Sequence, residues 1–356
     1  MTNPMLTNDL ISLSNHFKEN GFELRFVGGC VRDTLLGLTP KDVDLATDAN
    51  PDQQYEIYLK HNIKCIDTGL KHGTWTVVLD KPYEITSLRN DVTTDGRHAE
   101  VEYITDWFVD SCRRDFTINA MYKNFDGQIF DYHNGQNDLT NGIVRFVGNA
   151  DKRIKEDYLR ILRYYRFSAR FGSGVNEKEI VDNMKGLRQI SIERIWSELK
   201  QILNLPNAKN ILQLMNDHGI FQILDINIDV ERYKDHYLKP ETNLALMCYD
   251  FKIVSKQLKL STYETNLGNF VKNNDGITEH QAKIFLTENA NIDFVKEALL
   301  VNDSNADLTQ WDVPKFPING DMLIDKFKGV ALGNEIKRLR QIWYDSNFSN
   351  EILKDQ

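Results

Sequence analysis

The sequence has few cysteines and no long apolar run, and both absences exclude classes of protein. Its four cysteines, among 356 residues, show no CxxC spacing, so they predict neither a zinc site nor a disulfide framework. Unpaired thiols fit a reducing compartment, and we expect a cytoplasmic protein. No apolar stretch approaches the roughly 20 residues that a membrane helix needs, so no membrane partner is expected. Residues 1–20 contain Asp9 and Glu19 and no arginine, which predicts an amphipathic helix rather than a targeting peptide.

Other common signals are also missing. The eight histidines show no HxxxH spacing and no clustering with cysteine, so each is expected in a core or surface role. Internal repeats and low-complexity tracts are absent. No side chain stands out as a catalytic nucleophile, so we do not expect a reaction that passes through a covalent enzyme intermediate.

Basic residues are outnumbered, since 43 Lys and Arg stand against 52 Asp and Glu. The resulting net charge of -9 argues against a general nucleic-acid coat protein. Between Arg145 and Arg170, however, eight basic residues stand against three acidic ones. A basic stripe on an acidic protein suits local, transient contact with RNA and with a triphosphate.

The most informative stretch is residues 25–47, RFVGGCVRDTLLGLTPKDVDLAT. Its pattern predicts a strand, a glycine turn, a short helix, a second turn and a second strand. Gly28 and Gly29 let the backbone approach a phosphate, with N–H groups of the helix start facing the anion. Asp42 and Asp44 are two apart and are expected on one face of the second strand. Paired carboxylates need a compensating cation, and Mg²⁺ held by oxygen ligands and phosphates fits best.

The order of these residues resembles the nucleotidyltransferase superfamily of DNA polymerase β. The longer pattern GGxVRD…DxDxAT, which includes Arg32, is similar to the class II branch of tRNA nucleotidyltransferases (CCA-adding enzymes) and bacterial poly(A) polymerases. In that superfamily a third carboxylate from a neighbouring strand completes the metal site, and the resemblance suggests Glu84 for this role. A solvent-facing strand glutamate is the alternative for Glu84, and the sequence leaves both open.

Two segments bear on the branch of the family. The glycine-bounded turn TGLKHGT at residues 68–74 resembles CCA-adding enzymes rather than poly(A) polymerases, which carry a Gly-Arg-Arg-Phe-like segment in this region. Residues 89–106 are polar, with a turn at Asp95-Gly96, and resemble the flexible loop that the family needs before adding the final adenosine. An ordinary surface hairpin is the alternative for this loop.

Residues 113–121, RRDFTINAM, match a further family motif. Guanidinium groups bind phosphate oxygens through paired hydrogen bonds, and a carboxylate accepts from ribose hydroxyls. We therefore expect Arg114 to bind phosphate and Asp115 to bind the ribose of the incoming nucleotide.

Residues 156–167, EDYLRILRYYRF, predict a helix whose apolar face is opposite a row of arginines. Taken alone, this row could be a solvated face with weak ion pairs at helical spacing. The segment resembles the EDxxR motif of class II enzymes, which implies that Asp157 and Arg160 read the base. Cytosine and adenine both present an amino donor beside a ring acceptor, so one carboxylate–guanidinium pair suits either. Arg163 and Arg166 are then expected near the triphosphate.

These observations predict an α+β fold with three parts. A mixed α/β nucleotidyltransferase head with a small sheet spans residues 1–140 and ends near the turn-rich linker at 131–139. A helical neck for base recognition spans 141–220, supported by a helix at 192–203. A helical body and tail for tRNA binding spans 221–356, with a family-like tail segment at 318–336.

The expected reaction is template-independent addition of CCA to the 3′ end of tRNA from CTP and ATP, with release of diphosphate. Asp42 and Asp44, with Glu84, are expected to be catalytic, and Asp42 and Asp44 to hold Mg²⁺. The alternatives are an enzyme that adds only CC or only A, a poly(A) polymerase, and a non-catalytic RNA-binding protein. The sequence leaves monomer and homodimer equally open.

Overall fold

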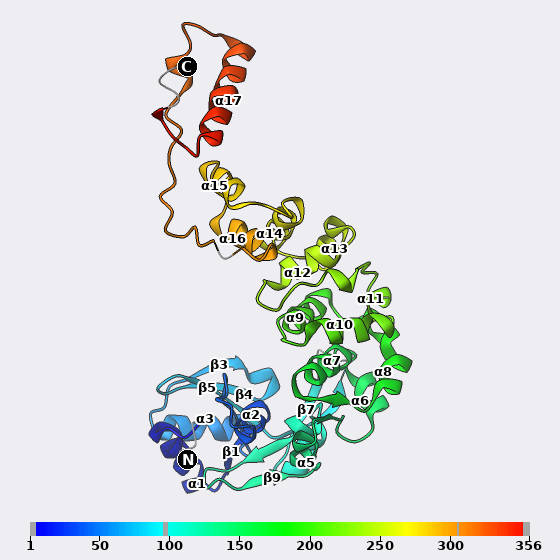
Figure 1. Ribbon diagram of the computed structural model, residues 1–356. Coiled ribbons are helices and arrows are strands. Elements are labelled where there is room, and N and C mark those ends of the chain that lie inside the picture. The colour runs from blue at the N-terminus through cyan, green and yellow to red at the C-terminus, as the bar shows by residue number, and fades with distance from the viewer. Residues whose placement is uncertain (1–4, 95–98, 305, 352–356) are drawn as a thin grey trace. The chain divides into compact units, whose positions relative to one another are not determined.

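The computed structural model describes residues 5–94, 99–304 and 306–351. The chain divides into two compact units, residues 1–225 and 226–356 (Figure 1). Every β-strand of the described residues lies in the first unit, and the second unit is helical. The predicted α+β class, with a sheet-based head followed by helices, is therefore confirmed. The division falls after Asp225, near the predicted start of the body at 221, while the head–neck boundary at 140 stays a prediction.

A seven-stranded mixed sheet organises the described part of the head. Its spatial order is β3-β4-β5-β2-β1-β8-β9. Strand β1 pairs antiparallel with β2 and β8, whereas β2 pairs in parallel with β5. The strands are β1 Leu24–Val27, β2 Asp44–Thr47, β3 Cys65–Gly69, β4 Thr74–Val78, β5 Pro82–Ser87, β8 Met121–Lys123 and β9 Ile129–Asp131.

The glycine turn after β1 has the predicted form. Gly28 has φ +71°, a conformation that side-chain-bearing residues rarely adopt, and helix α2 (Gly29–Leu35) starts directly after it. The Gly28 N–H donates to the carbonyl of Met121 in β8, 3.0 Å away, which fixes the turn against the sheet. Strand β2 begins only at Asp44, so Asp42 lies in the bend before the strand. The expectation that Asp42 and Asp44 share one strand is therefore wrong.

Two helices of the head, α1 (Asn8–Glu19) and α3 (Pro51–Lys60), pack against each other. The Phe17 ring of α1 meets the Tyr58 ring of α3 edge-on, with ring centroids 6.0 Å apart. Helix α3 starts with a capping box, in which the Asn50 and Gln53 side chains each accept a hydrogen bond from the other's backbone N–H. The remaining short head elements are η1 Leu70–His72, β6 Arg89–Thr94, β7 Ala99–Tyr103, α4 Trp107–Cys112 and η2 Thr117–Asn119.

Helix α7 (Arg160–Phe171) is central to the helical part of the first unit, where it contacts α9 and α10. Its buried residues include Ile161, Leu162 and Tyr165, which confirms the predicted apolar face. The prediction that this helix begins at Glu156 is wrong. Helix α6 ends at Glu156, Asp157 takes an extended conformation, and α7 begins only at Arg160. The other elements here are α5 Gly135–Thr140, β10 Ile143–Val144, α6 Ala150–Glu156, β11 Ser173–Gly174, α8 Glu177–Asn183, η3 Met184–Gln189, α9 Ile192–Leu203, α10 Ala208–Asp217 and α11 Ile220–Ile223.

The second unit has its own apolar core. Leu267 and Val271 of α14 and Val295 and Leu299 of α16 are buried in it. The Tyr344 hydroxyl of α17 donates to Glu288, 3.0 Å away, and joins the last helix to the end of α15. Among the described residues, no helix combines the length and apolarity needed to cross a membrane. The elements are η4 Val230–Arg232, α12 Pro240–Met247, α13 Phe251–Gln257, α14 Thr262–Asn273, α15 Glu279–Thr287, α16 Ile292–Val301, η5 Gly320–Met322 and α17 Gly329–Asp345.

Candidate active site

A cavity of about 690 Å³ lies in the first unit, where the glycine turn, β2, β5 and α7 come together. It collects residues that are far apart in the sequence, from Val27 to Arg170. Eleven of the twelve predicted site residues line this cavity, and the twelfth, Asp42, is described by the structure but does not line it. Those eleven are Gly28, Gly29, Arg32, Asp44, Glu84, Arg114, Asp115, Asp157, Arg160, Arg163 and Arg166.

Two carboxylates in this cavity sit on neighbouring strands. The parallel pairing of β2 with β5 places Asp44 directly beside Glu84. Desolvation raises the pKa of Asp44, and the charges of Glu84 and Asp42 raise it further, so all three carboxylates share one electrostatic environment. This donor set consists of oxygen atoms with excess negative charge, which suits a hard divalent cation such as Mg²⁺. Asp42 contributes to this field from the bend before β2.

Arg32 is buried and lies at the glycine turn. Its guanidinium donates to Asp33 at 2.7 and 2.9 Å and to the Asn119 side-chain oxygen at 2.6 Å. It also stacks over the Phe171 ring, 4.3 Å from the centroid. Burial lowers the pKa of Arg32 despite the Asp33 charge. The side chain therefore joins the glycine turn to α7 and adds positive charge to the cavity.

Asp110, which the sequence analysis did not single out, organises the arginines of the RRD motif. It is fully buried, and its Oδ1 accepts from Arg113 Nε at 2.8 Å and from the Arg89 backbone N–H at 3.1 Å. Its Oδ2 accepts from Arg114 at 3.0 Å and from the Tyr122 hydroxyl at 2.6 Å. Burial alone would raise the pKa of Asp110, but Arg114 and Arg113 outweigh it and hold the pKa far below its usual range. Asp110 thereby fixes Arg114 at the cavity wall.

Asp115, like Asp110, accepts hydrogen bonds on both of its carboxylate oxygens. Its Oδ2 accepts from Arg163 Nε at 2.9 Å and Nη2 at 2.6 Å, and its Oδ1 accepts from the Phe116 N–H and the Asn119 amide. Burial disfavours the charged form, but Arg163 prevails and lowers the pKa of Asp115 to about 2. Any further donor, such as a ribose hydroxyl, must replace one of these four.

The arginines on the exposed side of α7 line the cavity as a group, as their spacing predicts. Arg166 pairs with Glu198 of α9 at 2.8 Å, and Arg163 lies 3.5 Å from the same carboxylate. Glu198 is only 6% exposed, so this carboxylate is a buried counter-charge for both arginines. The predicted supporting helix at 192–203 thus supplies an ionic contact as well as apolar packing.

The Asp157–Arg160 pair differs from the expected helical neighbours. Asp157 accepts from Arg194 of α9 at 2.7 Å, and Arg160 donates to Glu156 at 2.9 Å and to the Arg153 carbonyl at 2.6 Å. Both side chains line the cavity, but each is held by its own partner. The extended backbone at Asp157 separates it from the helix on which Arg160 starts.

The predicted loop at 89–106 is a hairpin of β6 and β7 in its described residues. Its first residue, Arg89, lines the cavity and donates to the carbonyl of His72 in the TGLKHGT turn. Tyr103 at the other end lies against the same turn, with its hydroxyl 3.4 Å from the Leu70 carbonyl. Residues 95–98, including the predicted turn at Asp95-Gly96, lie outside the described residues.

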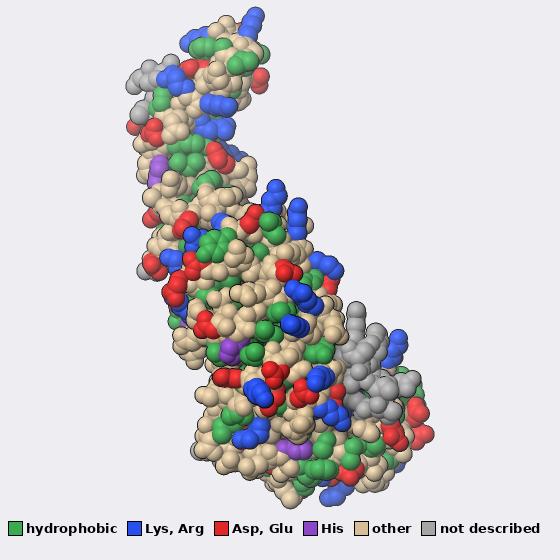
Figure 2. Space-filling view, turned by 90° about the vertical axis from the view of Figure 1, so that its right-hand side faces the viewer, with side chains coloured by type: hydrophobic (Ala, Val, Ile, Leu, Met, Phe, Trp, Pro, Cys, Tyr) green, Lys and Arg blue, Asp and Glu red, His purple; other side chains and the backbone are tan. Residues whose placement is uncertain are grey.

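Asp110, Arg194 and Glu198 were not predicted from the sequence, although each is a partner of site residues. The nearest signal for Glu198 and Arg194 was their position in the ERIWSEL segment, four residues apart and therefore on one helix face. Asp110 had no comparable signal, because its importance comes from burial beside Arg113 and Arg114. The distribution of surface charge does not indicate the site either, because positive and negative side chains are interspersed on the face drawn in Figure 2.

Paired carboxylates, a glycine turn and a wall of arginines on this fold define a nucleotidyltransferase. Residues 24–145 match the model of the poly A polymerase head domain, and residues 177–225 match that of the probable RNA and SrmB-binding site of polymerase A.

Comparison with individual proteins gives the narrower assignment. The chain is 39% identical to CCA tRNA nucleotidyltransferase 1, mitochondrial, of Danio rerio over 99% of this chain and 90% of that protein. It is also 32% identical to the CCA-adding enzyme of Lactobacillus johnsonii over 93% of this chain and 84% of that protein. The chain belongs to the CCA tRNA nucleotidyltransferase family, whose enzymes add C, C and A to the 3′ end of tRNA.

Solved structures agree with this assignment. The crystal structure of Bacillus stearothermophilus CCA-adding enzyme in complex with CTP matches with a TM-score of 0.76 and 25% identity, covering 98% of this chain and 94% of that one. The Thermotoga maritima CCA-adding enzyme complexed with tRNA shares the fold, with a TM-score of 0.65 and 20% identity over 92% and 90% of the two chains.

Proposed function

We propose that the cavity binds CTP and ATP in turn and positions either one for attack by the 3′-hydroxyl of tRNA. The hydroxyl oxygen bonds to the α-phosphorus, the bond from that phosphorus to the bridging oxygen breaks, and diphosphate leaves. The hydroxyl proton is released to solvent or to a nearby carboxylate. The observation that carries this proposal is one cavity lined by Asp44 and Glu84 together with the arginines of α7 and the RRD motif.

We assign the divalent cation, Mg²⁺, to Asp44 and Glu84, with Asp42 close enough to raise the pKa of Asp44. When bound, Mg²⁺ lowers the pKa of the attacking hydroxyl and neutralises triphosphate charge. The acidic residues provide an oxygen-only site beside the glycine turn, where the backbone can approach a phosphate. The variant Glu84→Gln tests whether Glu84 binds the metal. Wild-type activity with an unchanged dependence on Mg²⁺ concentration would place Glu84 outside the metal site.

The phosphates and ribose are assigned to residues that already carry partners. Arg114 is fixed by Asp110, and Arg32 by Asp33 and Asn119, so both present charge without needing to be ordered by the nucleotide. Asp115 is the proposed ribose ligand, but its oxygens are fully occupied. We therefore infer that Arg163 turns from Asp115 toward the triphosphate when a nucleotide enters, freeing one carboxylate oxygen for a ribose hydroxyl.

Base selection is assigned to Asp157 and Arg160. The carboxylate accepts from the amino group of cytosine or adenine, and the guanidinium donates to the ring nitrogen beside it. Guanine and uracil present the reverse order, so that an acceptor faces the carboxylate and a donor faces the guanidinium. Arg194 and Glu156 hold the two side chains in place at the cavity.

The function is tested by determining which nucleotides the protein adds to the 3′ end of tRNA. The protein is incubated with Mg²⁺ and each nucleoside triphosphate on three tRNAs, which lack CCA, CA or A, and the products are sequenced. We expect C, C and A to be added in order and synthesis to stop. Addition limited to CC or to A would indicate a partial enzyme, and a run of adenosines would indicate a poly(A) polymerase.

The matched control for this experiment is Asp44→Ala. It removes an exposed carboxylate from the first residue of β2, so fold and tRNA binding should persist while addition is abolished. Turnover by this variant within a few-fold of the wild type would contradict the assignment of the metal site.

We also propose a reducing compartment. All four cysteines lie among the described residues and are free thiols. Burial raises the pKa of Cys30 to about 11 and that of Cys248 to about 12, so both stay protonated and poorly reactive. The cytoplasm is the first candidate, and the mitochondrial names of the vertebrate relatives make that organelle the second. Cell fractionation decides between them, and light scattering of the purified protein decides between monomer and homodimer.

A further inference from the structure

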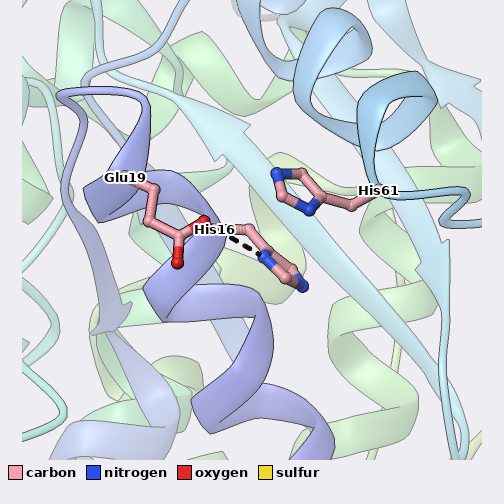
Figure 3. Close-up of side chains that lie close together, drawn as sticks. All are labelled: His16, Glu19 and His61. Atoms are coloured by element: carbon pink, nitrogen blue, oxygen red, sulfur yellow. Dashed lines mark ion pairs between the residues drawn. The ribbon is translucent and has the colours of Figure 1, made fainter.

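A small cluster of metal-binding side chains lies in the head, among residues that do not line the catalytic cavity. His16 and Glu19 belong to the last turn of α1, and His61 directly follows the end of α3. Figure 3 shows the three side chains gathered between these helices. One ligand atom from each residue lies within 4.8 Å of those of the other two.

Two nitrogen atoms of this cluster are shielded from solvent and make no hydrogen bond. They are His16 Nδ1 and His61 Nε2. The nearest Glu19 oxygen is 3.8 Å from His16 Nδ1, an ion-pair distance that is too long for a hydrogen bond. A shielded polar atom without a partner costs free energy, and a bound ion is one of the few explanations for it.

The contact between Ser12 and His16 favours the tautomer of His16 that can bind a cation. Ser12 Oγ lies 3.3 Å from His16 Nε2 and can accept the proton of that nitrogen, which leaves the lone pair on Nδ1. Neutral imidazole is the form that coordinates metals.

We propose that His16, Glu19 and His61 bind a borderline transition-metal cation, with Zn²⁺ the best fit, at a site separate from the catalytic cavity. Two imidazole nitrogens and one carboxylate are ligands that Zn²⁺ accepts, with water as the fourth. Mg²⁺ prefers oxygen-only sites, so the acidic pair Asp44 and Glu84 and this cluster differ in the cation they select.

Binding requires one rearrangement. The two imidazole rings are stacked, with centroids 3.7 Å apart and planes 23° from parallel, so their lone pairs run side by side. A shared cation must lie in both ring planes, and one ring has to rotate. His61 is suited to this because it follows α3 as the C-cap residue, and its unpartnered Nε2 gives up no hydrogen bond.

A bound cation would cross-link α1 and α3. These helices are also joined by the contact between the Phe17 and Tyr58 rings and by a 2.9 Å hydrogen bond from Lys60 to the side chain of Asn20. A cation that binds only the folded head raises its stability in proportion to the logarithm of its concentration. The Lys60 charge opposes a cation, and the Glu19 carboxylate compensates for it.

The test uses the full chain and keeps the catalytic carboxylates occupied with saturating Mg²⁺. Zn²⁺ is titrated by calorimetry into wild type, His16→Gln and His61→Gln, with His280→Gln in α15 as the matched control. We expect one Zn²⁺ site in wild type and in the control. Loss of either ligand should weaken it at least about tenfold, because removing even an outer-shell partner of a metal ligand costs that much.

A second measurement guards against unfolded variants and against binding by cysteine. Co²⁺ gives a visible spectrum that distinguishes nitrogen and oxygen ligands from thiolate, and we expect the former in wild type and its loss in His61→Gln. Thermal unfolding with and without Zn²⁺ should show a shift that is absent in the two variants. Equal Zn²⁺ affinity in wild type and both variants, or no Zn²⁺ binding by wild type, would overturn the proposal.

Discussion

Asp110 is a single side chain on which two parts of the cavity depend. Its two oxygens take donors from Arg113 and Arg114 and from the backbone of Arg89, the first residue of the β6–β7 hairpin. Removing a buried charge that serves several donors leaves all of them unpaired, which is costlier than losing one exposed ion pair. The same carboxylate therefore fixes both Arg114, the proposed phosphate ligand, and the first residue of the hairpin.

We expect Asp110→Asn to raise the KM for CTP and for ATP alike, because Arg114 loses the charge that fixes it. The loss in kcat/KM should be about 10- to 100-fold, the range for a charged hydrogen bond. The ratio between the two nucleotides should not change. Steady-state kinetics of Asp110→Asn is compared with Asp48→Asn, which removes a half-buried carboxylate of the same head that does not line the cavity. A changed CTP-to-ATP ratio would contradict this role.

Asp115 should make the stability of the protein depend on pH at the acidic end. Its folded-state pKa is about 2, below the ordinary 3.8, so the native state binds fewer protons than the unfolded state between these values. The stabilisation is complete above about pH 4 and is lost as pH falls toward 2. We expect Asp115→Asn to be less stable than wild type by about 2 kcal/mol at pH 7. Urea unfolding should show this gap narrowing below pH 4, and a constant gap would contradict the pairing with Arg163.

At the scale of elements, the sequence predicts what is local and periodic. The strand–turn–helix–strand order around Gly28, the apolar face of α7 and the helix at 192–203 are all confirmed. The break at Asp157 escaped prediction because the apolar spacing of a helix continues across it, from Ile154 to Tyr158 and Ile161. The end of α6 leaves no trace in that spacing. Partnerships such as Arg163 with Asp115, 48 residues apart, follow only from the folded chain.

Substitutions in and before α7 should affect base choice and phosphate binding separately. We expect Asp157→Ala to admit UTP or GTP, because rejection of a wrong base depends on leaving a buried group unpaired, worth about 1–3 kcal/mol, or roughly ten- to a hundredfold. Arg166→Ala should raise the KM of every nucleotide without changing which base is chosen. The measurement is kcat/KM for all four triphosphates in both variants. Unchanged ratios in Asp157→Ala, with only a general fall in rate, would make this segment a structural ion-pair face.

At the scale of the whole molecule, the two units should respond differently to a nucleotide. The described residues that line the cavity run from Val27 to Arg170 in the first unit, while the second unit has a separate core around Leu267 and Val295. We expect CTP with Mg²⁺ to slow backbone hydrogen exchange in α2 and α7 and to leave α14 and α16 unchanged. Mass spectrometry of exchanged peptides measures this directly. Equal protection of both units would show that CTP binding also orders the second unit.

The parallel pairing of β2 with β5 has a consequence for how such an enzyme can evolve. Neighbouring strands are held about 4.8 Å apart by backbone hydrogen bonds, so the separation of Asp44 and Glu84 is a property of the main chain. The side chains assigned to base choice, by contrast, lie outside the sheet, on α7 and in the extended segment before it. On the proposed assignments, the residues that set the speed of synthesis and those that set its accuracy therefore lie on different parts of the polypeptide. A lineage can lose or alter its fidelity while its catalytic rate is inherited unchanged.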